Sequence, residues 1–116
     1  GFYPETQVEV ARMAAQVISE DLHKHIAISQ IAERFSVSET SLKNYFRGVY
    51  GQNISTWLRE IRMDTAAELL SNTKRPIAEI SEQVGYSNQG KFAAVFKKRF
   101  GLSPLEYRRL KNLDKS

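Results

Sequence analysis

The sequence predicts an all-α protein of seven helices, arranged as two similar halves. Apolar residues recur at three- and four-residue spacing along most of the chain, and this spacing places them on one face of a helix. Serine and glycine residues stand where such helices would begin and end. We find no run of alternating apolar and polar residues that would predict a strand, so the all-α class follows.

The two halves repeat one pattern. Residues 28–57 and 77–107 align in their apolar, turn and glycine positions. The aligned pairs are 49 apart before the turn (Ile31 with Ile80, Phe35 with Val84, Ser38 with Ser87) and 50 apart after it (Leu42 with Phe92, Phe46 with Phe96, Gly51 with Gly101, Trp57 with Tyr107). This change of spacing indicates one residue inserted after Ser87. Each copy reads as a short helix, a tight turn and a second helix, which predicts two helix-turn-helix units.

The first half opens with a long helix and a short one. The long helix is expected from about Glu5 to Lys24. Its buried face would consist of Val8, Ala11, Ala15, Ile18 and Leu22. Ser29 is the expected N-cap of the short helix, which runs to about Phe35. The inward residues of this short helix would be Ile31, Ala32 and Phe35.

A third helix follows a turn at Ser36 and Val37. Ser38 is its expected N-cap, and Gly51, which tolerates positive φ, ends it after about Tyr50. Its inward residues would be Leu42, Tyr45 or Phe46, and Val49.

The fourth helix joins the two units. It is expected from an N-cap at Ser55 to about Ser71. Its buried stripe would be Trp57, Leu58, Ile61, Ala66, Leu69 and Leu70. We therefore predict a first helix-turn-helix subdomain in residues 1–54, a linker helix in residues 55–71 and a second subdomain in residues 72–116, together forming one domain.

The second half repeats the short and long helices. Pro76 fits the first turn of a fifth helix that runs to about Val84, because its missing N–H is not needed there. Gly85 makes the turn, and Ser87 is the expected N-cap of a sixth helix that ends at Gly101.

A seventh helix opens with a capping box. Ser103 and Glu106 have the spacing of that motif, and Pro104 occupies the first helical position. The helix is expected to reach about Lys111.

Composition and charge exclude several classes of protein. The chain has 116 residues and no cysteine, which excludes disulfides, cysteine nucleophiles and thiolate metal sites. No apolar run approaches the ~18 residues of a membrane span, so we expect a soluble cytoplasmic protein. Residues 1–50 carry five Lys/Arg against six Asp/Glu, whereas residues 51–116 carry twelve against seven. A basic partner surface is expected mainly on the second half, although charge alone favours nucleic acid no more than an ordinary solvated surface.

Four short motifs occur together in the second half. They are Ile77 to Ser81, Gly85-Tyr86-Ser87, Phe92 with Phe96-Lys97, and Phe100 to Pro104 followed by Tyr107-Arg108. This set resembles the signature of the AraC/XylS family of bacterial transcription regulators. The first half and the joining helix also look like that family, through Leu42, Phe46, Gly51 and the run from Leu58 to Leu70 with Arg62 and Ala66. The resemblance therefore covers nearly the whole chain.

The resemblance implies a fold and a function. The fold is a homeodomain-like tandem of two helix-turn-helix subdomains, whose recognition helices enter major grooves on one face of the duplex. The function is sequence-specific binding to double-stranded promoter DNA, with RNA polymerase as a possible further partner and without a cofactor or metal. In most members a sensor or dimerisation domain precedes this one. The start at Gly1 instead of Met agrees with a fragment of such a longer regulator.

The third helix would offer one polar face to DNA, because Leu42 and Phe46 point inward. The base-reading candidates on that face are Glu39, Thr40, Lys43, Asn44 and Arg47. Lys or Arg can bind guanine acceptors, Asn can bind adenine with two hydrogen bonds, and a Thr methyl can contact a thymine methyl. An ordinary solvated face would carry similar residues, and the repeat and the resemblance favour base reading over it.

The equivalent face of the sixth helix carries smaller side chains. Its base-reading candidates are Asn88, Gln89, Lys91 and Ala94. Gly90 lies inside this helix at a cost of about 1 kcal/mol relative to alanine, and it would let the backbone approach DNA closely. Phosphate contacts are assigned to Ser38, Ser87, Lys97 and Lys98. For Lys98 and Arg99, plain surface charge is an equal alternative.

Other functions compete with DNA reading. Aromatic residues can stack on single-stranded RNA, but their helical spacing favours core positions for Phe35, Phe46, Trp57, Phe92, Phe96, Phe100 and Tyr107. His23 and His25 are two apart and cannot share a helix face, which disfavours a metal site. No arrangement of residues resembles an enzyme site. The alternative function is a helical protein-interaction module that contacts RNA polymerase or a sensor domain.

Overall fold

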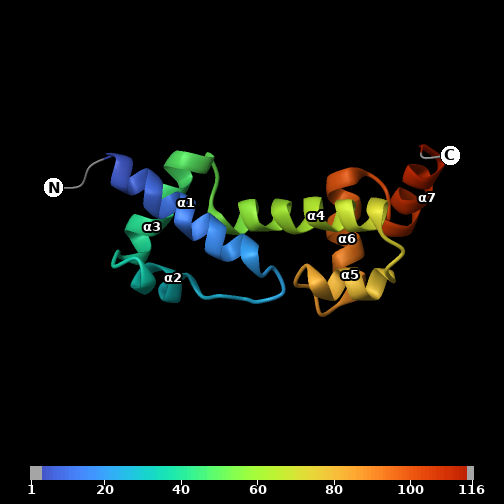
Figure 1. Ribbon diagram of the computed structural model, residues 1–116, viewed down its shortest axis with the longest axis horizontal. Coiled ribbons are helices and arrows are strands. Elements are labelled where there is room, and N and C mark those ends of the chain that lie inside the picture. Colours follow the sequence, from blue (N-terminus) through green and yellow to red (C-terminus); the bar gives the residue numbers. More distant parts are fainter. Residues whose placement is uncertain (1–3, 115–116) are drawn as a thin grey trace. The chain divides into compact units, whose positions relative to one another are not determined.

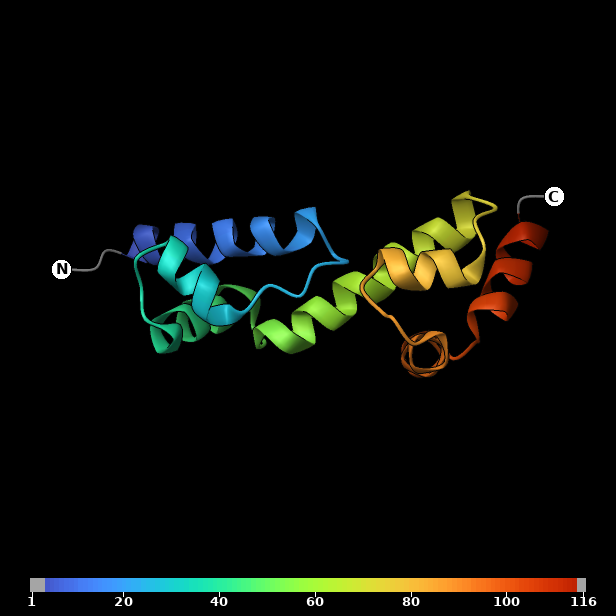
Figure 2. The ribbon, with the colours of Figure 1, turned by 90° about the horizontal axis from the view of Figure 1, so that it is seen from below.

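The computed structural model describes residues 4–114, so the expectation drawn from Gly1 lies outside the described residues. Within this range the chain forms seven α-helices and no strand, which confirms the predicted class (Figures 1 and 2). They are α1 (Pro4–Glu20), α2 (Ile28–Arg34), α3 (Glu39–Tyr50), α4 (Ile54–Asn72), α5 (Ile77–Gln83), α6 (Gln89–Phe100) and α7 (Pro104–Asp114). The chain divides into two compact units, which meet between Arg59 and Glu60 inside α4.

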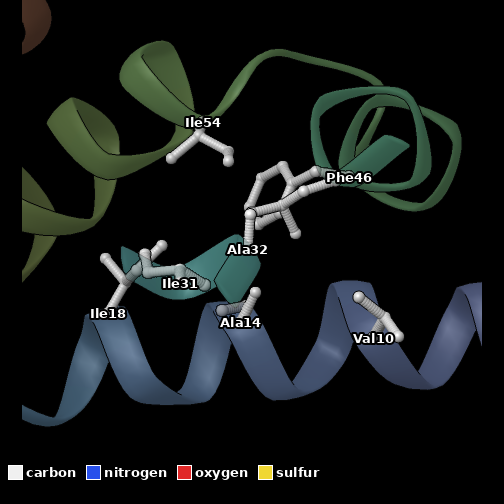
Figure 3. Close-up of a cluster of buried hydrophobic side chains, with 9 residues drawn as sticks. Val10, Ala14, Ile18, Ile31, Ala32, Phe46 and Ile54 are labelled. Carbon is white, nitrogen blue, oxygen red and sulfur yellow. The ribbon is translucent and has the colours of Figure 1, made fainter. Parts of the chain in front are cut away.

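The core of the first unit is formed by α1, α2, α3 and the start of α4. Figure 3 shows side chains of α1 pointing toward α2, α3 and the first turn of α4. The buried cluster consists of Val10, Ala14, Ala15, Ile18, Ile31, Ala32, Leu42, Phe46 and Ile54. Because Leu42 and Phe46 are fully buried, the opposite face of α3 is left at the surface.

The second unit has an equivalent core. Its buried residues come from the later part of α4 and from α5 and α6: Met63, Ala66, Ala67, Leu70, Ile80, Val84, Phe92 and Phe96. Phe92 and Phe96 are fully buried in the positions that Leu42 and Phe46 occupy in the first unit, 50 residues earlier. The second unit therefore holds α6 by the same face that holds α3.

Each core is closed by three aromatic rings. In the first unit, Phe46 lies 4.5 Å from Tyr50 and 5.2 Å from Trp57 between ring centroids, and the Trp57 ring meets Phe46 edge-on at 75°. In the second unit, Phe96 lies 4.6 Å from Phe100 and 5.3 Å from Tyr107, which is again edge-on, at 83°. Such tilted and edge-to-face pairs are favourable aromatic geometries. All seven aromatic residues predicted for the cores lie in the two buried clusters or pack against them, which confirms the prediction.

The repeat extends further than the aligned segments, because α4 has a role in both units. Its first turns supply Ile54, Trp57 and Leu58 to the first core, as α7 supplies Tyr107 to the second. The buried positions of its later turns follow those of α1 at a spacing of 52: Val10 with Arg62, Ala11 with Met63, Ala14 with Ala66, Ala15 with Ala67, and Ile18 with Leu70. The helix α4 thus closes one unit and opens the next.

Three predicted N-caps were wrong. The short helix α2 begins after Ala27, not Ser29, and has no side-chain cap. At the start of α4, Asn53 Oδ1 accepts a hydrogen bond from the Thr56 N–H at 2.8 Å, so Asn53 has the role predicted for Ser55. At the start of α6 the cap is Asn88, not Ser87. An N-cap needs a short polar side chain at the residue directly before the first helical residue. Where two such residues lie close together, the sequence does not show which of them occupies that position.

Other predicted boundaries agree with the structure or shift by a few residues. Ser38 caps α3, and Gly51 and Gly101 end α3 and α6 with left-handed φ values of 71° and 78°. Ser103 and Glu106 form the predicted capping box. The helix α1 ends at Glu20 instead of Lys24, Pro76 stands before the first turn of α5, and α7 continues past Lys111 to Asp114.

Candidate nucleic-acid interface

The exposed face of α3 carries all five residues predicted to read bases. Glu39, Thr40, Lys43, Asn44 and Arg47 are exposed, opposite the buried Leu42 and Phe46. The helix is anchored at both ends, because Ser38 Oγ accepts a hydrogen bond from the Ser41 N–H at 3.0 Å and the Gly51 N–H donates to the Arg47 carbonyl. The burial of Leu42 and Phe46 holds this helix in the core, and its opposite face is open to solvent.

An open groove of about 430 Å³ lies beside this face. Its walls come from α3, from the first residue of α2 and from the chain around the start of α4. The lining residues are Ile28, Thr40, Lys43, Asn44, Arg47, Asn53, Ile54 and Ser55. The groove brings together four of the five predicted residues, and Glu39 is not among them. Two cations and no carboxylate line it, which favours an anionic ligand.

The corresponding face of α6 is exposed but has a smaller set of free side chains. Gln89, Gly90, Lys91 and Ala94 are exposed, opposite Phe92 and Phe96. Asn88 is also exposed, and its Oδ1 accepts a hydrogen bond from the Lys91 N–H at 2.9 Å. One acceptor of a predicted base-reading residue therefore has a structural role, while its amide N–H groups remain available for donation.

The cap also explains why a glycine follows it. A Cβ placed on Gly90 would lie 3.2 Å from Asn88 Oδ1, closer than most such contacts. A larger residue at position 90 would crowd the oxygen that caps α6. Gly90 therefore protects the cap, whatever its value for close approach to DNA.

The turn before α6 contains the extra residue of the second unit. In both turns a backbone N–H at equivalent positions closes the bend, Val37 to the Ala32 carbonyl at 3.0 Å and Tyr86 to the Ser81 carbonyl at 2.9 Å. The caps Ser38 and Asn88 are 50 apart, so the inserted residue is Ser87 itself and not a residue after it. Ser87 is exposed and remains a candidate for phosphate contact.

The last turn of α6 presents three consecutive cations with two different environments. Lys97 and Lys98 are exposed. Arg99 donates from Nε at 3.0 Å and from Nη2 at 2.8 Å to Asp64 Oδ1 on α4. Its Nη1 also lies 4.0 Å from Glu60 Oε1. Arg99 is thus engaged within the protein, which sequence spacing could not reveal because Asp64 is 35 residues away.

Sequence reasoning also missed a buried arginine beneath the turn before α6. Arg62 is 8% exposed, and its Nε lacks a hydrogen-bond partner. Its Cζ lies 6.0 Å from the centre of the Tyr86 ring. Burial lowers the pKa of Arg62, an effect that the nearby Tyr86 opposes. The alignment of α4 with α1 was the available signal, since Arg62 takes the place of the buried Val10.

The part of the chain that the structure describes contains no group of three or more His, Cys, Asp or Glu residues able to hold a metal ion. None of the helices described is both long and apolar enough to cross a membrane.

The chain is similar in sequence to a helix-turn-helix family and to bacterial regulatory proteins. Residues 31–110 match the family described as "Helix-turn-helix domain". The arabinose operon regulatory protein of Salmonella typhimurium is 38% identical over 98 residues, which cover 84% of this chain and 35% of that protein. The chain thus spans about a third of the length of that relative. The regulatory protein SoxS of Escherichia coli K12 is 33% identical over 91 residues, covering 78% of this chain and 85% of SoxS.

A solved structure shares the fold. The DNA-binding domain of AdpA, described as a global transcriptional factor and solved in complex with a target DNA, has a TM-score of 0.82 and 22% identity. The match covers 90% of this chain and 94% of that chain. At this identity the likeness concerns the arrangement of helices.

Proposed function

The chain belongs to the AraC family of helix-turn-helix transcription regulators, as a match to their C-terminal DNA-binding domain, and we propose that α3 and α6 are its two DNA-reading helices. The observation that carries this proposal is the duplicated burial of one face of each helix. Leu42 and Phe46 hold α3, and Phe92 and Phe96 hold α6. In both cases the opposite face is exposed, as direct reading of a major groove requires; that of α3 is polar, and that of α6 combines Gln89 and Lys91 with the small Gly90 and Ala94.

On α3, the chemistry of the exposed face supports base reading. Lys43 and Arg47 suit guanine acceptors, Asn44 suits adenine, and Thr40 suits a thymine methyl. These four side chains share the lining of the groove beside α3. Glu39, in the first turn, would accept from a cytosine amino group.

On α6, the exposed side chains support a division between base edges and phosphates. We assign Gln89, Lys91, Ala94 and the amide N–H groups of Asn88 to base edges. Lys97 and Lys98 belong to phosphates, because they are exposed cations in the last turn. Ser38 and Ser87 stand at the starts of the two helices and complete the phosphate set.

The two reading helices have different sequences, so we propose an asymmetric target. It would consist of two major-groove segments about one helical turn apart, on the order of 34 Å. Residues 55–71 would act as the linker between the subdomains 1–54 and 72–116. For the whole protein we propose an upstream sensor or dimerisation domain, contact with RNA polymerase, and action in the bacterial cytoplasm.

Binding selection with random duplexes tests the proposal. Duplexes retained by the chain from a randomised library would be sequenced, and affinity for the selected and scrambled duplexes would be measured by fluorescence anisotropy at several salt concentrations. We expect the selected duplex to bind on the order of a thousandfold more tightly, with both affinities falling as salt rises. Equal affinity for both duplexes at every salt concentration would refute sequence-specific binding.

A further inference from the structure

We propose that Arg99 and Asp64 form a clamp that fixes the orientation of α6, and that this clamp sets how well the second unit discriminates between DNA sequences. Arg99 would act as a positioning residue and would not contact DNA. The inference rests on the proposed function, since it concerns the accuracy with which α6 reads bases.

The geometry of the pair is that of a directional contact. Two nitrogens of one guanidinium, Nε and Nη2, donate to the same carboxylate oxygen of Asp64 at 3.0 and 2.8 Å. The guanidinium carbon also lies 5.4 Å from the centre of the Phe100 ring. Two donors of one planar group that converge on one oxygen restrict the direction from which the guanidinium meets Asp64, unlike a single lysine contact. The pair therefore ties one side of α6 to one side of α4.

The apolar core holds α6 by one face, through the buried Phe92 and Phe96. On α4, the core partners of Phe92 and Phe96 include the small side chains of Ala66 and Ala67. A helix with its side chains has a radius of about 5–6 Å, so a roll of about 10° moves a side chain on the far face by about 1 Å. Reading a base edge requires placement within about 0.5 Å. A directional contact at the flank of the packed face supplies that control.

The clamp belongs to the second unit alone among the described residues. The residue 50 before Arg99 is Val49, and the α1 residue that aligns with Asp64, 52 before it, is Arg12. Neither an arginine on α3 nor a carboxylate on α1 stands at these positions. In the first unit, α3 makes its corresponding contacts without such an ion pair. The second unit has small residues, Gly90 and Ala94, on its reading face. Small side chains cannot change conformation to compensate for a shift of the helix, as long ones can.

Its ion pairs within the protein also distinguish Arg99 from the two lysines that precede it. Lys97 and Lys98 are exposed. Arg99 faces two carboxylates, Asp64 and, at 4.0 Å, Glu60. These acids reduce the attraction of Arg99 for phosphate. Its charge is thereby used for orientation, while the two lysines provide attraction to DNA.

Two single variants with opposite changes of charge test the clamp. Arg99→Ala removes a positive charge, whereas Asp64→Ala removes a negative one. Affinities for the selected and scrambled duplexes would be measured for the full chain. If the pair positions α6, both variants lower the ratio of the two affinities by about three- to tenfold, as loss of an oriented, partly exposed ion pair allows. An effect of charge alone would instead move affinity for both duplexes in opposite directions in the two variants.

Two further variants complete the experiment. The double variant Asp64→Arg with Arg99→Asp should restore most of the ratio, because the pair is rebuilt in reverse. Lys98→Ala is the matched control, and we expect it to weaken both duplexes alike and to flatten the salt slope by about 0.9, with the ratio unchanged. Asp64→Asn, which keeps the shape of the side chain, serves as a second single variant if Asp64→Ala proves unstable in thermal melts.

The outcomes separate the clamp from the function on which it rests. If Arg99→Ala behaves like Lys98→Ala, Arg99 contacts phosphate and the clamp is refuted. An unchanged ratio in Asp64→Ala and Asp64→Asn refutes it as well. If the unmodified chain does not prefer the selected duplex, the proposed function itself fails, and the clamp fails with it.

Discussion

Gly48 and Gly51 lie three residues apart at the end of α3 and differ in backbone conformation. Gly48 is inside the helix, whereas Gly51 ends it with a φ of 71°. Nothing lies within 4 Å of a Cβ placed on either residue. Any effect of a methyl group therefore comes from the backbone and not from packing.

We expect alanine to change stability in opposite directions at these two positions. Gly51→Ala should lower the free energy of unfolding by about 1–2 kcal/mol, because left-handed backbone is strained for an L-residue. Gly48→Ala should raise it by up to about 1 kcal/mol, through the better helix propensity of alanine. Urea unfolding of the two variants measures both. If both variants changed the free energy of unfolding in the same direction, backbone conformation alone would not explain the effects of the added methyl groups.

Arg62 is a charged residue in a buried, mainly apolar position. It occupies a core position that holds Val10 in the first unit, with Nε unpartnered and the Tyr86 ring nearby. Burial disfavours the charged form and so lowers its pKa. Its aliphatic stem packs as a hydrophobic residue would, while its head group bears a cost of desolvation.

Replacing Arg62 by an unbranched apolar residue should therefore be tolerated. We expect Arg62→Met to leave the free energy of unfolding unchanged or to raise it by about 1 kcal/mol, since it keeps volume and removes an unpartnered buried donor. Arg62→Ala should instead cost about 2 kcal/mol or more, because it leaves a cavity. Chemical denaturation compares them, with the exposed Arg59→Met as control. A Met variant destabilised as much as the Ala variant would mean that the guanidinium, and not the volume of the side chain, stabilises the fold.

At the scale of elements, helix starts show what local pattern can and cannot predict. Ser38 and the Ser103–Glu106 capping box are correct because each stands directly before an apolar helical run. Ser55 fails because it already lies in the first turn of α4, after the cap Asn53, and Ser87 fails because it lies one residue before the cap Asn88. The repeat held the missing information, since Asn53 is 50 before Ser103 and Asn88 is 50 after Ser38.

The cap of α6 gives a direct test of this correction. Asn88→Ala should lower the free energy of unfolding by about 1 kcal/mol, whereas Ser87→Ala should change it by no more than about 0.5 kcal/mol. Thermal or urea unfolding of the two neighbouring variants measures the difference. Larger destabilisation by Ser87→Ala would restore serine as the cap.

The capping box of α7 should make stability depend on pH. The Ser103 N–H donates to Glu106 Oε1 at 2.9 Å, and this bond, with that to the Ser103 side chain, lowers the pKa of Glu106 below its usual 4.5. A lowered folded-state pKa stabilises the protein above the unfolded value and loses that contribution as pH falls below it. Melting temperatures from pH 7 to pH 3 would compare the chain with Glu106→Gln. We expect the advantage of glutamate to shrink below about pH 4.5, and a constant difference would contradict this.

For the whole molecule, the repeat and the helical spacing of apolar residues were sufficient to predict the class, the order of the helices and the exposure of one face each of α3 and α6. They could not predict contacts between residues distant in sequence, such as Arg99 with Asp64 or Arg108 Nε with the Leu70 carbonyl at 3.1 Å. From the sequence, residues 55–71 were predicted to form a single linker helix. The two ends of α4 follow different spacings, 50 toward α7 and 52 toward α1, so a single alignment did not reveal that each end completes a different core.

DNA binding by the whole molecule should separate base-reading from phosphate-binding residues. Lys43→Ala or Asn44→Ala should reduce discrimination at one base position, at a cost of about 1–3 kcal/mol on the selected duplex and little on a scrambled one. Lys97→Ala should weaken both duplexes alike and flatten the salt slope by about one unit. Anisotropy titrations over a set of singly substituted duplexes measure this. Equal losses on every duplex for all three variants would contradict the assignment of roles.

The double membership of α4 makes the two halves depend on each other during unfolding. In an uninterrupted helix, the N–H groups of residues 60–63 donate to the carbonyls of residues 56–59, on the other side of the boundary between the units. Melting either half therefore strips partners from the terminal turn of its neighbour. A duplicated protein joined by a flexible linker would lose its halves independently, whereas here we expect disruption at one end of α4 to weaken the helix at its other end.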